Sequence, residues 1–103
     1  MTKRLNLSPR AKRDIDEIWD FSDNRWGTKR ANRYVGDIRK KMERVAKNPG
    51  LGRTCDDIHP GYLMISSGSH MIFYRRAGSG IRILRVLHQS MDFERHLNTR
   101  LLA

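Results

Sequence analysis

The residues best equipped for chemistry lie in the last third of the chain, in two short segments. The first, 66–75, reads Ser-Ser-Gly-Ser-His-Met-Ile-Phe-Tyr-Arg, and the second, 85–92, reads Arg-Val-Leu-His-Gln-Ser-Met-Asp. Both contain strand-like runs, and the short glycine-containing turn 77–80 joins them. Their hydroxyl, imidazole, phenol and guanidinium groups suit two kinds of chemistry: binding of an anionic partner, or proton transfer.

Arginine is the candidate for a binding role. Arg53, Arg75 and Arg85 could hold phosphates or a carboxylate-rich partner through forked hydrogen bonds. The plainer interpretation is that such arginines alternate with core residues along strands and face solvent. Arg85 differs because it interrupts an otherwise apolar strand, so we expect it to have a specific partner. We predict a target-facing patch made of Arg53, Arg75, Arg85 and His88.

Histidine is the candidate for catalysis. His88 could act as a general acid or base in RNA cleavage, or it could hydrogen-bond to the backbone and fix a turn. The sequence shows no accompanying nucleophile or paired base, which favours the structural role. His70 and Tyr74 lie four residues apart on one strand face, which predicts a hydrogen-bonded structural pair. Asp92 is expected to form a local cap, and no residue is predicted to be catalytic.

The composition of the chain indicates which kinds of partner it can attract. The 103 residues include 21 Lys and Arg against 11 Asp and Glu, so the net charge is +10 and acidic partners are attracted. Nucleic acid, an acidic protein or plain solvation all remain open. The four histidines and the single cysteine, Cys55, have no metal-ligand spacing, so we expect no metal and no cofactor. One cysteine cannot form an internal disulfide, which is consistent with a reducing cytoplasm. No long apolar run precedes Ser8-Pro9, so neither a signal peptide nor a membrane span is expected.

Two amphipathic helices are predicted to support this C-terminal hairpin. After a short strand at 3–7, Ser8 caps a helix that has Pro9 at its first position. Trp26 is expected to fasten the corner to the second helix, and Gly27 to allow the break. Thr28 is predicted to cap the second helix, and the segment Asn-Pro-Gly at 48–50 is predicted to end it. The apolar stripes of the two helices contain Ile15, Trp19, Val35, Ile38 and Met42.

The remaining elements complete an α+β domain. Three strands are predicted at 62–66, 70–76 and 81–87, followed by a short helical turn within 91–97. The order β-α-α-β-β-β predicts a helical hairpin packed on a mostly antiparallel four-stranded sheet. The first strand is expected at the sheet's edge, and the last strand, apolar on both faces, at its centre. We expect a single domain over 1–97 and a mobile tail over 98–103.

The chain resembles ParE-type toxins of the ParE/RelE superfamily along nearly its whole length. Nine short segments carry the resemblance in the right order: Leu-Ser-Pro-Arg-Ala (7–11), Asp-Ile-Asp-Glu-Ile-Trp (14–19), Arg-Trp-Gly (25–27), Asn-Pro-Gly-Leu-Gly-Arg (48–53), Pro-Gly-Tyr (60–62), Ser-Gly-Ser-His (67–70), Phe-Tyr-Arg (73–75), Arg-Val-Leu-His-Gln-Ser-Met-Asp (85–92) and Arg-His-Leu (95–97). Each segment alone is weak, and together they are specific.

The resemblance implies a bacterial type II toxin that binds and inhibits DNA gyrase and is neutralised by a ParD-type antitoxin. It implies no enzyme activity, and no direct sequence-specific binding of nucleic acid is expected. The exposed edges of the stripe around Ile15, Trp19, Val35, Ile38 and Met42 are predicted to receive an antitoxin helix. An acidic antitoxin segment would complement the basic charge of this chain.

Two departures from the family pattern keep alternatives open. Leu63 stands where these toxins often carry an arginine after Gly-Tyr, which puts toxicity in question. RNA-cutting relatives named for RelE carry an arginine near the position of Met71, whereas an acidic residue that some of them use would fall near Asp56. The alternatives are therefore a ribosome-dependent mRNA endoribonuclease and a non-toxic relative that only binds antitoxin.

Overall fold

The computed structural model describes residues 4–97, so the predicted mobile tail at 98–103 lies outside the described residues. Along the chain, its elements are β1 (Leu5–Leu7), α1 (Pro9–Trp26), α2 (Thr28–Lys47), the 3-10 turn η2 (Pro49–Leu51), β2 (Arg53–Thr54), β3 (Leu63–Ser67), β4 (His70–Ala77), β5 (Gly80–His88) and α3 (Phe93–Leu97). The predicted helices and strands are all present, with boundaries shifted by one or two residues.

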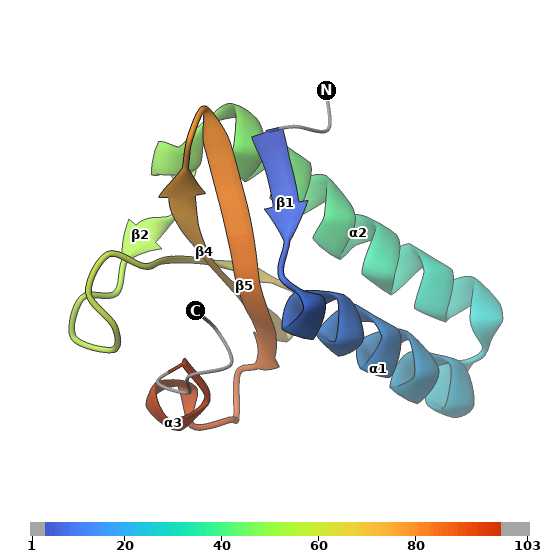
Figure 1. Cartoon of the computed structure of the whole chain (residues 1–103). Helices are drawn as coiled ribbons and strands as arrows, with labels where there is room; N and C mark the ends of the chain where they lie inside the picture. Colours follow the sequence, from blue (N-terminus) through green and yellow to red (C-terminus); the bar gives the residue numbers. More distant parts are fainter. Residues whose placement is uncertain (1–3, 98–103) are drawn as a thin grey trace.

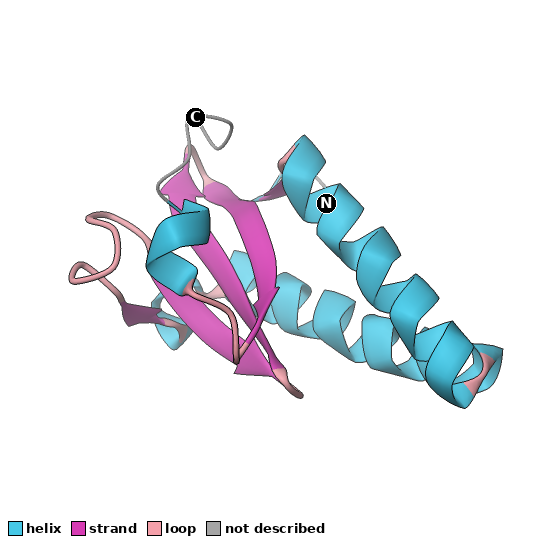
Figure 2. Ribbon diagram, turned by 90° about the horizontal axis from the view of Figure 1, so that it is seen from below, coloured by secondary structure: helices cyan, strands magenta, loops and turns pink. Residues whose placement is uncertain are grey.

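A twisted sheet separates the long helices from the short one (Figures 1 and 2). The strand order is β1-β5-β4-β3-β2, with β1 parallel to β5 and the other pairs antiparallel. This confirms the α+β class and the edge position of β1, and it places β5 inside the sheet between β1 and β4, although the middle strand is β4 and not β5. The sheet has five strands rather than the predicted four, because Arg53 and Thr54 pair with Met64 and Leu63. Two exposed residues are too short a segment for alternation to reveal.

The helical hairpin begins and turns at the residues that the sequence indicated. The Ser8 hydroxyl accepts a hydrogen bond from the Ala11 N–H (3.0 Å), and Pro9 follows as the first helical residue. Gly27 has a φ of 94°, which favours glycine, and it lies between the two helices. Gly27, not Thr28, is the N-cap of α2, because the Thr28 hydroxyl donates to Asp23 instead (2.6 Å).

Two hydrophobic clusters lie on opposite faces of the sheet. The larger one joins the buried stripes of α1 and α2 to one face, with Ile38, Ile72 and Ile83 fully buried at its centre. The smaller one lies under α3 and the connector between β2 and β3, and it contains Cys55 and Phe73. The helices are longer than the sheet is wide, so their far ends extend beyond it (Figure 1).

A β-bulge in β5 fixes the position of α1. The register with β4 shifts so that Phe73 faces Arg85 while Tyr74 faces Ile83, which leaves Leu84 as the extra residue. The first turns of α1 take up the backbone groups at this bulge. The Ser8 hydroxyl donates to the Leu84 carbonyl (2.8 Å), and the Val86 N–H donates to the Asp14 carboxylate (2.9 Å). The helix is thereby tied to the strand that carries the sequence-predicted site.

Candidate partner-binding groove

An open groove of about 400 Å³ runs between α1 and the ends of β4 and β5. Its α1 wall includes Arg10, Glu17, Ile18 and Phe21, and its other wall includes Val86, Leu87 and Met91. Three of the four large apolar side chains that are exposed within residues 4–97 lie on its rim: Phe21, Trp26 and Met91, at 54%, 49% and 37% exposure. Such a concentration of exposed apolar surface marks a site of interaction.

The α1 wall has the spacing of one helix face. Asp14, Ile18, Ser22 and Trp26 lie four residues apart, and Phe21 is their neighbour on the same stripe. Part of this stripe is covered by the sheet, and the part near Trp26 belongs to the end of the hairpin that extends beyond the sheet (Figure 2). The Trp26 ring is flanked by the guanidinium groups of Arg25 and Arg30, at 5.6 and 4.8 Å from its centroid. An apolar helix face with a cationic rim suits a partner helix that carries acidic residues.

A polar cluster closes the sheet end of the groove, and Tyr34 of α2 organises its first half. The Ser69 N–H donates to the Tyr34 oxygen (2.9 Å), and the Tyr34 hydroxyl lies 2.7 Å from His70 Nδ1. We assign the tyrosine hydrogen to this contact, because His70 Nδ1 is its one acceptor within the described residues, and this assignment places the hydrogen of the neutral ring on Nε2. Burial, followed by the nearby His88, lowers the pKa of His70 to about 4, so the ring is neutral near pH 7.

His88 forms the second half of the cluster. Its Nδ1 accepts the Ser90 N–H (3.1 Å) and lies 2.7 Å from the Ser90 hydroxyl. Because a backbone N–H can only donate, Nδ1 carries no hydrogen, and the neutral ring is protonated at Nε2. The His70 and His88 rings meet edge to face, with centroids 5.3 Å apart. The cluster therefore presents two imidazoles whose basic nitrogens are already in use.

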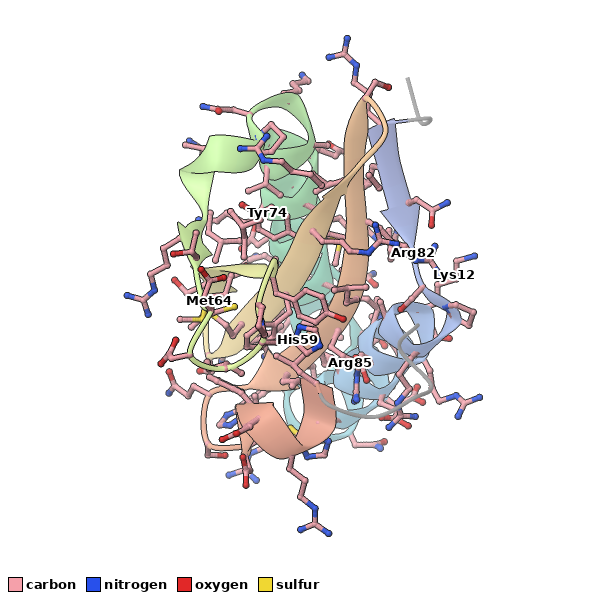
Figure 3. The ribbon with its side chains drawn as sticks, turned by 60° about the vertical axis from the view of Figure 1, so that its left-hand side comes forward. Lys12, His59, Met64, Tyr74, Arg82 and Arg85 are labelled. Carbon is pink, nitrogen blue, oxygen red and sulfur yellow. The ribbon has the colours of Figure 1, made fainter. Side chains whose placement is uncertain are left out.

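Arg85 does not belong to a target-facing patch, which corrects the sequence prediction. Its guanidinium is 4% exposed and donates to both carboxylate oxygens of Asp14, at 2.8 and 3.0 Å. Figure 3 shows Arg85 on β5 beside the first turns of α1. Asp14 thus faces the sheet. The specific partner expected for Arg85 is an internal carboxylate.

The other members of the predicted patch are separated from one another. Arg53 lies on the edge strand β2, whereas His88 lies at the end of β5. His88 is opposite His70, and Arg75 is five residues further along β4, about 17 Å away along the strand. Arg75 is instead opposite Arg82, which donates to Asn6 on β1. The structure therefore brings His88 into the groove and leaves Arg53 and Arg75 outside it.

The predicted antitoxin-binding stripe is mostly core. Ile15, Val35, Ile38 and Met42 are at most 8% exposed and pack between the helices and the sheet, so they offer a partner no surface. The periodicity identified the buried face of the hairpin rather than its free face. Trp19 is only partly buried, and its indole N–H donates to Asn32 of α2 (2.8 Å).

The residues predicted to be structural have varied surroundings. Tyr74 is buried, and its hydroxyl bridges the Gly52 N–H and the Pro49 carbonyl (2.9 and 2.7 Å), so it does not pair with His70. Asp92 accepts the Arg95 N–H at the start of α3 (3.2 Å). Trp26 is half exposed on the rim of the groove and is not a core residue at the corner.

The sequence reasoning missed Asp14, Phe21 and Tyr34. The sequence did contain a sign of the role of Asp14. This residue lies next to Ile15 in the apolar stripe of α1, and the apolar run of β5 likewise contains one charged residue, Arg85. A charge in each of two apolar stripes indicates a buried ion pair. Phe21 and Tyr34 had no such sign, because an aromatic residue at helical spacing reads as core.

Outside the groove, the described residues form no further group that suggests catalysis or metal binding. Within residues 4–97, no group of three or more His, Cys, Asp or Glu side chains is arranged to hold a metal ion. Cys55 is buried, and burial together with Asp57 and Asp56 raises the pKa of its thiol. A search of the same residues finds no helix both long and apolar enough to cross a membrane.

Comparison with known proteins places this fold. The family described as the ParE toxin of the type II toxin–antitoxin system parDE matches residues 5–93. Toxin ParE1 of Mycobacterium tuberculosis is 47% identical over 98 residues, covering 94% of this chain and all of the relative. Toxin ParE1 of Caulobacter vibrioides is 43% identical over 95 residues, covering 92% and 98% of the two chains.

Among solved structures, a chain of the chromosomal ParDE system from P. aeruginosa superposes with a TM-score of 0.73. That match covers 82% of this chain and 92% of the other, at 23% identity, and it supports the fold. The two chains thus share one α+β fold. With the family match and these relatives, the chain belongs to the ParE toxins of type II toxin–antitoxin systems.

Proposed function

We propose that this protein inhibits DNA gyrase in the cytoplasm and is neutralised by a ParD-type antitoxin, one of whose helices docks in the groove along α1. The observation that carries the docking proposal is the rim of the groove, where Phe21, Trp26 and Met91 are exposed beside a stripe of α1. Apolar anchors on one helix face are the usual receptor for an amphipathic helix. The net charge of +10 favours an acidic partner.

The state of the two histidines supports action by binding rather than by RNA cleavage. A general base needs a free lone pair within reach of the proton that it removes. The lone pairs on Nδ1 of His70 and His88 already accept hydrogen bonds from Tyr34 and Ser90. Arg85, three residues before His88, is held by Asp14. The two Nδ1 atoms therefore offer no free lone pair to a general base.

Contact with the target is proposed for two arginines outside the groove, the exposed Arg53 and the partly buried Arg75. Arg53 is exposed at the sheet edge, and Arg75 lies beside Arg82 on β4 and β5. Leu63 pairs with Thr54 and Tyr74 and packs on the core. Because leucine is uncharged, it cannot supply the cation that related toxins often have at this position. We therefore assign the cationic contact to Arg53 and Arg75.

The gyrase proposal is tested with purified protein in a DNA supercoiling assay. Inhibition, or accumulation of cleaved DNA, is expected, and it should disappear when the antitoxin encoded by the neighbouring gene is added. Supercoiling that is unaffected at large molar excess would refute gyrase inhibition. Cuts in ribosome-bound messenger RNA that depend on His88 would support the ribonuclease instead. Antitoxin binding without any effect on growth would identify a non-toxic relative.

The docking proposal has a matched pair of variants. Phe21→Asp places a charge on the rim of the groove, whereas Leu51→Asp places one on an equally exposed apolar residue outside it, at 48% against 54% exposure. We expect Phe21→Asp to weaken antitoxin binding by about 30-fold or more, because a central apolar anchor contributes about 2 kcal/mol. Leu51→Asp should bind normally. Equal affinities for the two variants would refute docking in the groove.

A further inference from the structure

We propose that the His70–His88 pair at the sheet end of the groove binds the carboxylate of one Asp or Glu side chain on the docked antitoxin helix. This proposal rests on the proposed docking of the antitoxin and adds the chemistry that the partner must carry. The groove is an open stripe along α1 rather than a closed cavity, so the antitoxin helix would lie along it. We therefore assign the carboxylate to a side chain within that helix.

The first argument is the direction in which the histidines donate. Both Nδ1 atoms accept hydrogen bonds, so each neutral ring carries its hydrogen on Nε2. Neither Nε2 has a partner among residues 4–97, although both rings line the groove. Two N–H donors at the end of an apolar groove require an acceptor when a partner excludes water. A carboxylate has two acceptor oxygens and no donor, which suits a pair of donors.

The second argument is the charge around the pair. The other ionisable groups that line the groove are Arg10, Asp14 and Glu17 on α1, Tyr34 on α2 and Arg85 on β5. Asp14 is occupied by Arg85 and the Val86 N–H, so it is not available to the histidines. Glu17 is exposed on α1, where Arg10 provides a charge of opposite sign on the same wall. An incoming carboxylate therefore does not meet an unbalanced negative field.

The third argument concerns protons. In the free protein, burial and the neighbouring His88 lower the pKa of His70 to about 4. A bound carboxylate favours the charged imidazole of His70 and raises the pKa of that ring. The complex then takes up a proton that the free protein does not hold, so affinity increases as the pH falls. The increase is at most about tenfold per pH unit for each proton taken up.

The experiment measures antitoxin affinity for four variants between pH 8 and pH 6. His88→Ala removes a donor and should weaken binding about tenfold, the loss of a hydrogen bond to a charged group. His88→Gln keeps an N–H donor, so it should retain most of the affinity. His70→Gln also keeps a donor but cannot take up a proton, so it should show a flatter pH dependence. His59→Ala, outside the groove and stacked on Tyr62, is the control.

A double-mutant cycle identifies the carboxylate. Each Asp and Glu in the toxin-binding segment of the antitoxin is changed to Asn or Gln, alone and against His88→Ala. One change is expected to weaken binding about as much as His88→Ala and to add little to it, which is the mark of a direct contact. Thermal melting of each variant checks that it is folded. Because His88 is exposed, its replacement should not unfold the protein.

Each outcome decides the proposal. If Phe21→Asp weakens binding but every histidine variant binds like the control, the groove is the docking site and the carboxylate assignment is wrong. If Phe21→Asp also has no effect, docking in the groove and the carboxylate contact both fail. If a short RNA binds and loses its affinity in His88→Ala while antitoxin binding is unchanged, the histidines recognise phosphate, which also overturns the proposal.

Discussion

Arg85 and His88 lie three residues apart on β5, yet their polar groups have opposite environments. The Arg85 guanidinium is buried, and Asp14 accepts two of its hydrogen bonds. The His88 ring is exposed at the groove, with one nitrogen held by Ser90 and the other without a partner in the described chain. The closed cluster holds α1 on the sheet, and the open cluster is left for another molecule. Similar positions in the sequence therefore give a structural contact in one case and a recognition site in the other.

The largest expected effect comes from opening the closed cluster. Asp14→Ala leaves the buried Arg85 charge and the Val86 N–H without their acceptor. We expect the free energy of unfolding to fall by about 3–5 kcal/mol, which urea denaturation would measure. Asp16→Ala, an exposed position on the same helix, should change it by less than about 0.5 kcal/mol. Similar losses for the two variants would mean that the ion pair does not hold the fold.

A smaller loss is expected from the other tie between α1 and β5. Ser8→Ala removes the cap of the Ala11 N–H and the donor to the Leu84 carbonyl. Loss of an N-cap costs about 1 kcal/mol, and the unpaired carbonyl at the bulge increases that cost to about 2 kcal/mol. Ser8→Asp, which can cap but cannot donate when ionised, should recover only part of it. A full recovery by Ser8→Asp would show that the bond to Leu84 contributes nothing.

The open cluster should contribute less to stability than to binding. Tyr34→Phe removes the hydroxyl that joins the Ser69 N–H to His70 Nδ1, and we expect a loss of about 1 kcal/mol in unfolding free energy. It also frees His70 to change its tautomer, so the ¹⁵N shifts of the His70 ring should move toward an Nδ1–H form. Shifts like those of the unchanged protein would refute the tautomer assigned to His70.

The open cluster should also make stability depend on pH. The pKa of His70 is lowered in the folded state from 6.5 to about 4, so between these values the unfolded chain binds a proton that the folded protein does not. Its contribution to stability is therefore lost as the pH falls from about 6.5 toward 4. His70→Gln should show a shallower decline than the unchanged protein in urea denaturation at a series of pH values. Parallel declines would show that His70 titrates normally in the fold.

Local sequence signals predicted most of the fold. Ser8-Pro9 placed the start of α1, a glycine placed the break between the helices, and the apolar faces of β5 placed this strand inside the sheet. Each of these features is set by residues that lie close together in the sequence, so sequence patterns can predict it. The two-residue β2 was missed because its pairing with β3 exists only in three dimensions.

The candidate site was harder to predict because long-range contacts define it. Asp14 and Arg85 are 71 residues apart, and although a specific partner was expected for Arg85, the sequence did not identify it as Asp14. Helical periodicity marked Ile38 and Met42 as apolar, but it could not tell a core face from a docking face. The groove is lined by residues such as Phe21, whose exposure depends on how the helices and the sheet pack in three dimensions.

The central claim, that the open groove and not the closed cluster receives the antitoxin, can be tested by cross-saturation NMR on the complex. The labelled protein is observed while the unlabelled antitoxin is irradiated, so that only residues in contact lose signal. We predict losses along the groove, at Ile18, Phe21 and Trp26 on α1 and at His88 and Met91 beyond β5. Losses confined to the arginine-bearing end of β4, with α1 unaffected, would contradict the account.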